Sequence, residues 1–228
     1  MLLPKIIVFT DLDGTLLDLM TYSAEHSAAA LKKLQQAGIP VVFCSSKTRV
    51  EQEVYRQECA VNDPFIVENG SAILVPEDYF SFDFPFQRKK GNYKVIELGS
   101  RIGEIKSAIE SVRFSVREDF LGYADLELGE VMQLTGLDEA SAKRATEREY
   151  SETILKGDTS SAAFQRFGLQ LARFGFSCVS GGKFHTIMAK GSNKGRAVKI
   201  LADLYRRQFP HIRTVGIGDS ANDMPMLR

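Results

Sequence analysis

The chain has 228 residues, 44% hydrophobic and 25% charged, which is the composition of an ordinary globular protein of one or two domains. Its 29 basic residues balance 29 acidic ones, so the strongly basic surface of nucleic-acid-binding proteins is excluded. The sequence lacks the run of about 20 apolar residues that a membrane span requires, and its three cysteines are scattered without metal-ligand spacing. We therefore expect a cytoplasmic protein that binds neither nucleic acid nor a membrane.

The first predicted element is a buried strand over residues 6–10, which ends at Asp11 and Asp13. On a strand, residues spaced i and i+2 point to the same side. At the carboxyl end of a parallel strand, that side opens onto the crevice where α/β proteins bind ligands. Two carboxylates so close repel each other unless a cation compensates them, and Mg²⁺ is the usual cation beside a phosphate. Gly14 permits a tight turn there, and Thr15 offers a hydroxyl group.

The next elements continue a strand–helix alternation. A helix ends near Gly38, an apolar strand covers residues 41–44, a helix covers 49–58, and a third strand covers 64–67. The predicted strands are apolar throughout, as in sheets covered on both faces, and their connections are short. This pattern predicts an α/β fold with a doubly wound parallel sheet.

From about residue 79 to 189 the pattern changes to α+β. Its strands, such as residues 93–98, are more polar, and amphipathic helices are expected at 101–113, 138–149 and 159–174. Two further strands, at 176–180 and 184–189, are expected to form a hairpin. We therefore predict a catalytic core of residues 1–80 and 190–228, with an inserted α+β cap domain of residues 81–189.

A second acidic cluster follows the last predicted strand, residues 214–218. Asp219 and Asp223 come directly after it, and a helix with Ser192 as its expected cap precedes it. If this strand lies beside the first one in a parallel sheet, the two acidic clusters face each other. Several carboxylates converging there would hold Mg²⁺, completed by water and a substrate phosphate. The residues thus predict magnesium-assisted phosphoryl transfer with a carboxylate nucleophile.

Four segments together resemble the haloacid dehalogenase superfamily of phosphatases. They are Asp11-Leu-Asp13-Gly-Thr15, Ser45 at the end of the second strand, Lys194 at the start of a helix, and Gly218-Asp-Ser-Ala-Asn-Asp223. They occur in the superfamily's order and in its secondary-structure context. The resemblance implies a Rossmann-like core, and the position of the insertion implies a type-2 cap.

Within that superfamily the chain is most similar to the mannosyl-3-phosphoglycerate phosphatases. This resemblance depends on shorter motifs: Ser45-Ser-Lys-Thr48, Glu68-Asn-Gly70, Arg148-Glu-Tyr-Ser-Glu152 and Gly181-Gly-Lys-Phe-His185. It implies hydrolysis of mannosyl-3-phosphoglycerate to mannosylglycerate and phosphate. That family tends to have proline where this chain has Thr153. Sucrose-, trehalose-, hexose- and glucosylglycerate-phosphates therefore stay alternative substrates.

The resemblance also implies roles at the phosphate. Asp11 would be the nucleophile that forms an aspartyl-phosphate, and Asp13 would be the general acid and base. Asp11 and Asp219 would bind Mg²⁺ through carboxylates, Asp13 would bind it through its backbone carbonyl, and Asp223 would orient metal-bound water or Lys194. Lys194, rather than the nearby Lys190, would offset negative charge on the transferred group.

Further residues are expected to bind the phosphorylated sugar. The expected ligands are Ser45 and Ser46 for the phosphate, Glu68, Asn69 and Gly70 for the pocket, and Arg148, Gly182 and Lys183 from the cap. A phosphoglycerate carries a carboxylate, which calls for a cationic partner such as Arg148 or Lys183. The alternative for each of these residues is an ordinary structural role in a turn or at the surface.

Two other classes of protein share part of this pattern. A signalling receiver domain also combines aspartates, Mg²⁺, a hydroxyl group and a lysine on a doubly wound sheet. Such domains lack a large insertion and do not need the second aspartate at i+2. A catalytically silent relative that serves as a binding module is the other alternative, and the intact set of Asp11, Asp13, Lys194 and Asp219 argues against it.

Overall fold

The computed structural model describes residues 4–116, 119–181 and 184–228. The chain forms two compact units. Unit 1 contains the described residues up to Lys47, together with 52–98 and 193–228; unit 2 contains 48–51 and the described residues of 99–192. Among the described residues, none of the helices combines the length and the low polarity that a membrane crossing requires.

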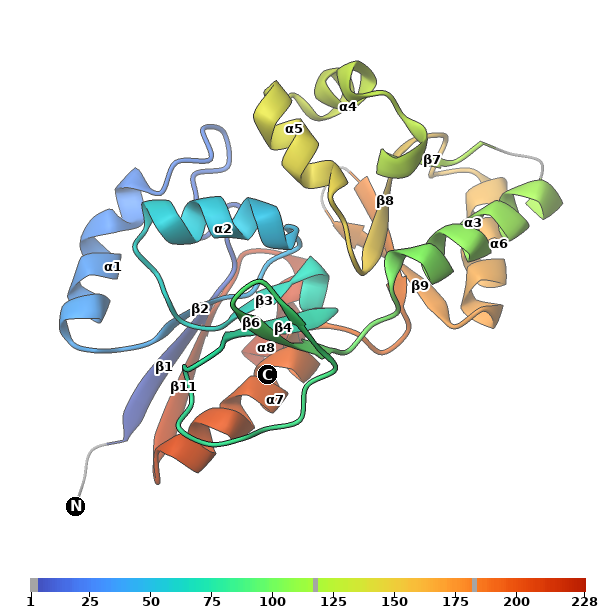
Figure 1. The fold of residues 1–228 in the computed structure, drawn as a ribbon. Helices are drawn as coiled ribbons and strands as arrows, with labels where there is room; N and C mark the ends of the chain where they lie inside the picture. Colours follow the sequence, from blue (N-terminus) through green and yellow to red (C-terminus); the bar gives the residue numbers. More distant parts are fainter. Residues whose placement is uncertain (1–3, 117–118, 182–183) are drawn as a thin grey trace. The chain divides into compact units, whose positions relative to one another are not determined.

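A parallel sheet forms the centre of unit 1 (Figure 1). It has the order β11-β1-β2, with β1 at Lys5–Thr10, β2 at Val41–Phe43 and β11 at Ile212–Ile217. Both neighbours run parallel to β1, and Val8 is in register with Val41 on one side and Val215 on the other. Strands from the two ends of the sequence are thus adjacent, and their carboxyl ends share one edge. The predicted α/β fold class with a parallel core sheet and an inserted α+β unit is confirmed.

Among the described residues, four α-helices lie wholly or mostly in unit 1: α1 at Glu25–Gln36, α2 at Arg49–Glu58, α7 at Lys194–Gln208 and the short α8 at Met224–Leu227. The first three residues of α2 belong to unit 2. The cap of α7 is Asn193 and not the predicted Ser192, because the Asn193 side chain accepts a hydrogen bond from the Arg196 N–H at 2.9 Å. The buried face of α7 packs with β1, β2 and β3 side chains in one hydrophobic cluster. Lys194 is therefore the first residue of a helix that is fixed by its own core contacts.

The third predicted strand lies beside β2 in parallel, as expected, and it also joins a second sheet. β3 (Phe65–Val67) meets the parallel sheet through a single bridge between Cys44 and Ile66, and it pairs antiparallel with β4 (Ala72–Pro76). A second sheet results, with the order β3-β4-β6-β5, where β5 is Arg88–Lys90 and β6 is Tyr93–Glu97. Residues 81–98, which the sequence assigned to the cap, therefore lie in unit 1. The predicted boundaries at 80/81 and 189/190 differ from those of the structure, 98/99 and 192/193.

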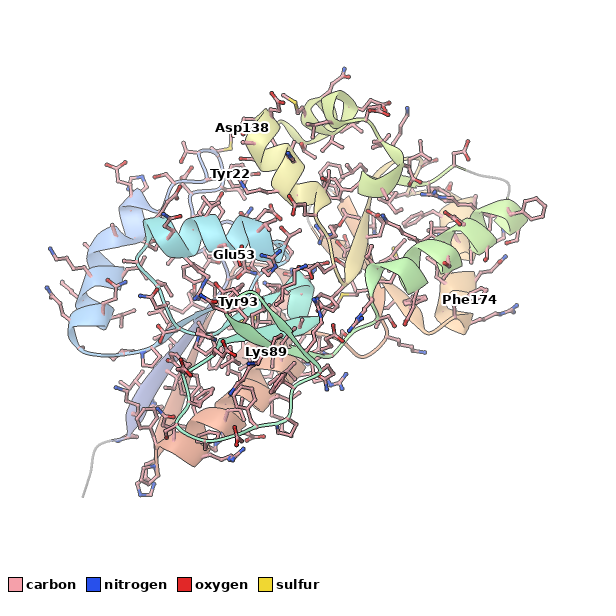
Figure 2. All side chains as sticks on the ribbon, viewed as in Figure 1. Tyr22, Glu53, Lys89, Tyr93, Asp138 and Phe174 are labelled. Atoms are coloured by element: carbon pink, nitrogen blue, oxygen red, sulfur yellow. The ribbon has the colours of Figure 1, made fainter. Side chains whose placement is uncertain are left out.

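Unit 2 is an antiparallel sheet with helices. The sheet has the order β7-β8-β10-β9, formed by Leu121–Gly122, Ser151–Lys156, Phe184–Ala189 and Phe176–Gly181. Its helices are α3 (Ile102–Val116), α4 (Leu128–Thr135), α5 (Glu139–Thr146) and α6 (Ala162–Arg173). Asp138, labelled in Figure 2, caps α5 by accepting a hydrogen bond from the Ser141 N–H. α3 and α6 pack on the sheet through a core that includes Ile109, Phe167 and Ile187.

Candidate active site

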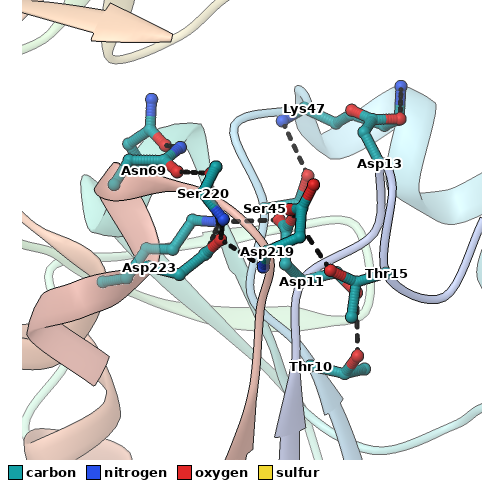
Figure 3. A network of polar contacts seen from close by, with 12 residues as sticks. Thr10, Asp11, Asp13, Thr15, Ser45, Lys47, Asn69, Asp219, Ser220 and Asp223 are labelled. Carbon is teal, nitrogen blue, oxygen red and sulfur yellow. Dashed lines mark hydrogen bonds and ion pairs between the residues drawn. The ribbon is translucent and has the colours of Figure 1, made fainter. Parts of the chain in front are cut away.

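Three chain segments meet at the carboxyl edge of the parallel sheet in unit 1 (Figure 3). Asp11 follows β1, Ser45 follows β2, and Asp219 follows β11. The Asp11 N–H extends the β1–β11 ladder by donating to the Ile217 carbonyl at 2.9 Å. Hydrogen bonds of the sheet itself therefore place the first acidic cluster beside the second.

The carboxylates of Asp11, Asp219 and Asp223 each offer an oxygen, and these oxygens all lie within 4.8 Å of one another. Asp11 and Asp223 are buried and Asp219 is exposed. Burial raises the pKa of Asp11 to about 6, although the nearby Lys194 ammonium lowers it. Acidic oxygens this close, partly removed from water, form the hard oxygen donor set that Mg²⁺ prefers, and the residues fit that ion.

Lys194 is the cation that the protein itself supplies to this cluster. Its Nζ donates to Asp11 Oδ1 at 2.6 Å and to Asp223 Oδ1 at 2.5 Å, and its side chain is only 1% exposed. Burial alone would lower the pKa of Lys194, but its carboxylate partners hold that pKa above the ordinary value. The ammonium group is therefore charged, and it connects the N-terminal and C-terminal acidic segments.

Asp13 is not part of the three-carboxylate cluster. Its Oδ1 lies 3.0 Å from Lys47 Nζ, in an ion pair without hydrogen-bond geometry. The Lys47 ammonium also lies 5.0 Å from the ring centre of Tyr22 and 5.5 Å from that of Tyr55. The Asp13 carboxylate thus points to a different cation from the one that contacts Asp11. The predicted role of its backbone carbonyl as a metal ligand stays a prediction.

The segment Asp219–Asp223 is held by its own last residue. Asp223 is fully buried, and its Oδ2 accepts hydrogen bonds from the N–H groups of Asp219 at 3.2 Å and Ser220 at 3.0 Å. Its Oδ1 accepts from Lys194. Asp223 therefore fixes both the turn that carries Asp219 and the lysine beside Asp11.

Close packing also selects glycine at Gly14, which adopts a left-handed φ of 75°. A Cβ at this position would lie 2.4 Å from Asp219 Oδ2. The Thr15 hydroxyl lies 3.4 Å from the other oxygen of the same carboxylate. The tight turn after Asp13 thus brings backbone against the Asp219 carboxylate, which a side chain at residue 14 would displace.

The predicted phosphate and pocket residues of unit 1 form two adjoining turns. Ser45 is buried, and its hydroxyl accepts a hydrogen bond from the Lys47 N–H at 3.2 Å. Glu68, Asn69 and Gly70 form a 3-10 turn in which all three residues have positive φ. The N–H groups of Glu68 and Asn69 donate to the Lys47 and Ser45 carbonyls at 3.1 and 3.0 Å. The turn therefore supports the loop that contains Ser45, Ser46 and Lys47.

The predicted cap residue Arg148 belongs to unit 2. Its Nε donates to the Ser151 hydroxyl at 3.0 Å, and its guanidinium lies 5.6 Å from the ring centre of Tyr123. Glu152 is buried, and burial raises its pKa. Its carboxylate accepts hydrogen bonds from the N–H groups of Tyr123 and Thr153. Gly182 and Lys183, also predicted to bind substrate, lie outside the described residues.

Two polar residues of unit 1 have a clearer place in the site than the sequence indicated. Lys47 forms the ion pair with Asp13. Its position two residues after Ser45, which follows the second strand, is the sequence feature that indicates a lysine near the site. Asn222 donates from Nδ2 to Asn69 Oδ1 at 3.0 Å, across 153 positions of sequence. No local pattern reveals that second contact, because it depends on how two distant turns approach each other.

Comparison with curated proteins finds relatives that align with almost the whole of this chain. A glucosyl-3-phosphoglycerate/mannosyl-3-phosphoglycerate phosphatase from Methanococcoides burtonii is 42% identical, over 98% of this chain and 82% of the relative. A mannosyl-3-phosphoglycerate phosphatase from Pyrococcus furiosus is 39% identical, over 97% of this chain and 86% of the relative. Identity at this level over almost the whole of this chain identifies a common family.

Solved structures share the fold. A protein from Thermoplasma acidophilum superposes with a TM-score of 0.66 at 18% identity, over 98% of this chain and 80% of that one. A sugar phosphatase of haloacid dehalogenase subclass IIB superposes with a TM-score of 0.65 at 18% identity, over 97% and 84% of the two chains. The family model for haloacid dehalogenase-like hydrolases matches residues 8–116 and 129–228. The chain therefore belongs to the haloacid dehalogenase-like hydrolase family.

Proposed function

We propose that this protein is a Mg²⁺-dependent phosphatase that hydrolyses mannosyl-3-phosphoglycerate to mannosylglycerate and phosphate. The observation that carries the chemistry is the meeting of Asp11, Asp219 and Asp223 within 4.8 Å, with the Lys194 ammonium on two of them. A carboxylate nucleophile needs its negative charge balanced before a phosphate dianion can approach it. In this cluster the Lys194 ammonium, together with a bound Mg²⁺, would balance the negative charge of the carboxylates.

In the proposed reaction, Asp11 Oδ attacks phosphorus and the bond to the glycerate oxygen breaks, which leaves an aspartyl-phosphate. Asp13 protonates the departing oxygen and later takes a proton from the water that hydrolyses the acyl phosphate. The separate ion pair of Asp13 with Lys47 supports this division of labour. One carboxylate is thereby kept for the nucleophilic step and the other for proton transfer.

The charge on the transferred group is met by two kinds of cation. Asp11 and Asp219 carboxylates and the Asp13 carbonyl would hold Mg²⁺, which supplies Lewis-acid stabilisation of the phosphoryl oxygens. Lys194 contributes a fixed ammonium group that binds a phosphate oxygen while it restrains Asp11. The Ser45 hydroxyl, beside the same edge of the sheet, donates to another phosphate oxygen.

The proposed substrate is inferred from the relatives. The two named above act, by their names, on mannosyl-3-phosphoglycerate, and the one from Methanococcoides burtonii acts on the glucosyl compound as well. Glucosyl-3-phosphoglycerate is therefore the second candidate. Arg148 of unit 2 is proposed to bind the carboxylate of such a substrate, and a cytoplasmic location is proposed with it.

Phosphate release from a panel of substrates tests the proposal. Purified protein with Mg²⁺ is given mannosyl- and glucosyl-3-phosphoglycerate, sucrose- and trehalose-phosphate, and hexose phosphates. The highest kcat/KM is expected for mannosyl-3-phosphoglycerate, and the Asp11→Asn variant is expected to be inactive on all of them. Preference for another sugar phosphate would change the substrate alone, whereas no release from any compound would reject the phosphatase.

A further inference from the structure

We propose that Asn69 is a positioning residue for the metal-binding segment Gly218–Asp223, acting through its hydrogen bond with Asn222. This inference deepens the proposed function and rests on it, because it concerns how the Mg²⁺ ligand Asp219 is held. The contact joins the turn after β3 to the segment after β11, which are far apart in the sequence.

The segment Gly218–Asp223 is fixed by polar contacts more than by packing. Asp219, Ser220 and Ala221 are exposed, so hydrophobic packing does not restrain the stretch that carries the ligand. Polar contacts anchor it instead: those of Asp223, buried beneath it, that of the Thr15 hydroxyl with Asp219 at 3.4 Å, and that of Asn222, whose Nδ2 donates to Asn69 Oδ1 at 3.0 Å. The Ser220 hydroxyl in turn donates to Asn222 Oδ1 (Figure 3 shows the Ser220 and Asn69 ends of this network).

Asn69, in contrast, is rigidly held. It is 6% exposed, and its N–H donates to the Ser45 carbonyl at 3.0 Å. Its backbone lies in the left-handed region, with φ 59° and ψ 30°, a conformation that asparagine tolerates better than most residues. The neighbouring Gly70 touches the backbone of Asn193, where a Cβ would come within 2.2 Å of the carbonyl oxygen. The turn is thus fixed against both the Ser45 loop and the start of α7.

Because Asn69 is held more firmly than the segment Gly218–Asp223, Asn69 positions the segment and not the reverse. A rigid turn presents an acceptor oxygen to an exposed loop, and the loop's asparagine reaches it. Groups that orient metal ligands through hydrogen bonds commonly contribute about 10- to 100-fold in metal affinity. Loss of the Asn69 amide is therefore expected to weaken Mg²⁺ binding at Asp219 without removing any ligand.

The test is calorimetric titration of Mg²⁺ into the full-length, substrate-free protein and its variants. Asn69→Gly keeps the left-handed backbone accessible but removes the amide, and Asn222→Ala removes the other partner. Each is expected to raise the Mg²⁺ dissociation constant about 10-fold. The double variant is expected to bind no more weakly than Asn222→Ala alone, because Asn222→Ala already removes the contact with Asn69 together with the one from Ser220. Asn92→Gly, at an exposed turn of the same unit, is the matched control and is expected to bind Mg²⁺ like wild type.

Urea unfolding of each variant separates positioning from a merely structural role. A structural role lowers the free energy of unfolding but leaves the Mg²⁺ dissociation constant of the folded protein unchanged. Wild-type affinity in folded Asn69→Gly, or effects of the two single variants that multiply in the double variant, would overturn the proposal. If wild-type protein itself bound no Mg²⁺, the metal-dependent function would fail instead, so the two failures are distinguishable.

Discussion

Lys194 Nζ lies 2.6 Å from Asp11 Oδ1, and the two residues are almost completely removed from solvent. The same ammonium group lies 2.5 Å from Asp223 Oδ1, so one cation serves two buried carboxylates. This excess of negative charge, with Asp219 close by, is unfavourable for folding and suited to binding a divalent cation. Stability and the proposed function therefore oppose each other at this edge of the sheet.

Replacing Lys194 by methionine tests that relationship. The variant retains a long apolar stem but leaves Asp11 and Asp223 without their ammonium partner. Breaking a buried pair in this way costs about 3–5 kcal/mol, so a loss of that order in the free energy of unfolding is expected in metal-free buffer. Urea unfolding measures it, and phosphate release is expected to fall with it. Unchanged stability would show that the two carboxylates do not depend on Lys194.

The raised pKa of Asp11 predicts how stability changes with pH. Its folded pKa is about 6 against an ordinary 3.8, chiefly because burial disfavours the charged form. The folded protein therefore holds this proton more tightly than the unfolded chain. The penalty is absent below pH 4, grows as pH rises to about 6, and reaches about 3 kcal/mol above that.

Asp11→Asn removes this titration and keeps the shape of the side chain. In metal-free buffer, wild-type protein is expected to lose stability relative to Asp11→Asn as pH rises from 4.5 to 7. Urea unfolding at several pH values measures the difference. A difference that stays constant across this range would contradict the raised pKa.

Mg²⁺ is expected to stabilise the folded protein, since the unfolded chain has no assembled ligand set. At a concentration 100 times the dissociation constant, one bound ion contributes about 2.7 kcal/mol. Asp219→Asn is expected to abolish this increment and the phosphatase activity, yet to leave metal-free stability nearly unchanged because Asp219 is exposed. Thermal unfolding with Mg²⁺ and with EDTA measures both quantities.

Asp203→Asn is the control for that experiment. Asp203 is exposed, lies in the same unit on α7, and pairs only with the exposed Arg206 among the described contacts. This variant is expected to respond to Mg²⁺ like wild type. An equal loss of Mg²⁺ stabilisation in both variants would indicate a general charge effect and would argue against a site at Asp219.

The core sheet and its acidic edge were predictable because their signals are local. β1 and β2 are continuous apolar runs that stop at polar residues, as expected of buried parallel strands. β5 has no such signal, since Arg88–Lys90 is basic throughout and becomes a strand only by pairing with β6. The predicted boundary at residue 81 differs from the end of this part of unit 1 for the same reason: the polar strand β6 pairs with β4 and not within the inserted unit.

The same distinction applies to the candidate site. The positions of Asp11 and Asp219 follow from strand ends that the sequence marks clearly. The ion pair of Asp13 with Lys47 and the contact of Asn69 with Asn222 depend on the paths of loops, which carry no periodic pattern. β11 also differs from expectation. Its apolar sequence predicts a buried strand, yet Val215 and Ile217 are 38% and 46% exposed.

Gly70 offers a prediction about the turn beneath the Ser45 loop. It has a φ of 89°, and a Cβ there would lie 2.2 Å from the Asn193 carbonyl oxygen and 2.7 Å from the Lys194 nitrogen. Gly91 in the same unit also has a positive φ, 55°, but a Cβ there would meet nothing within 4 Å. Comparing alanine variants at these two glycines therefore separates the cost of a left-handed backbone from the cost of steric overlap.

Gly91→Ala is expected to lower the free energy of unfolding by about 1–2 kcal/mol, the cost of a left-handed alanine. Gly70→Ala carries that cost and a further 1–3 kcal/mol, about the range for overpacking, because backbone atoms at the start of α7 must move. Lys194 begins that helix, so its ammonium shifts away from Asp11 and the variant loses activity as well. Urea unfolding and phosphate release of the two variants measure these effects, and equal losses in both would contradict the close approach of Gly70 to Asn193.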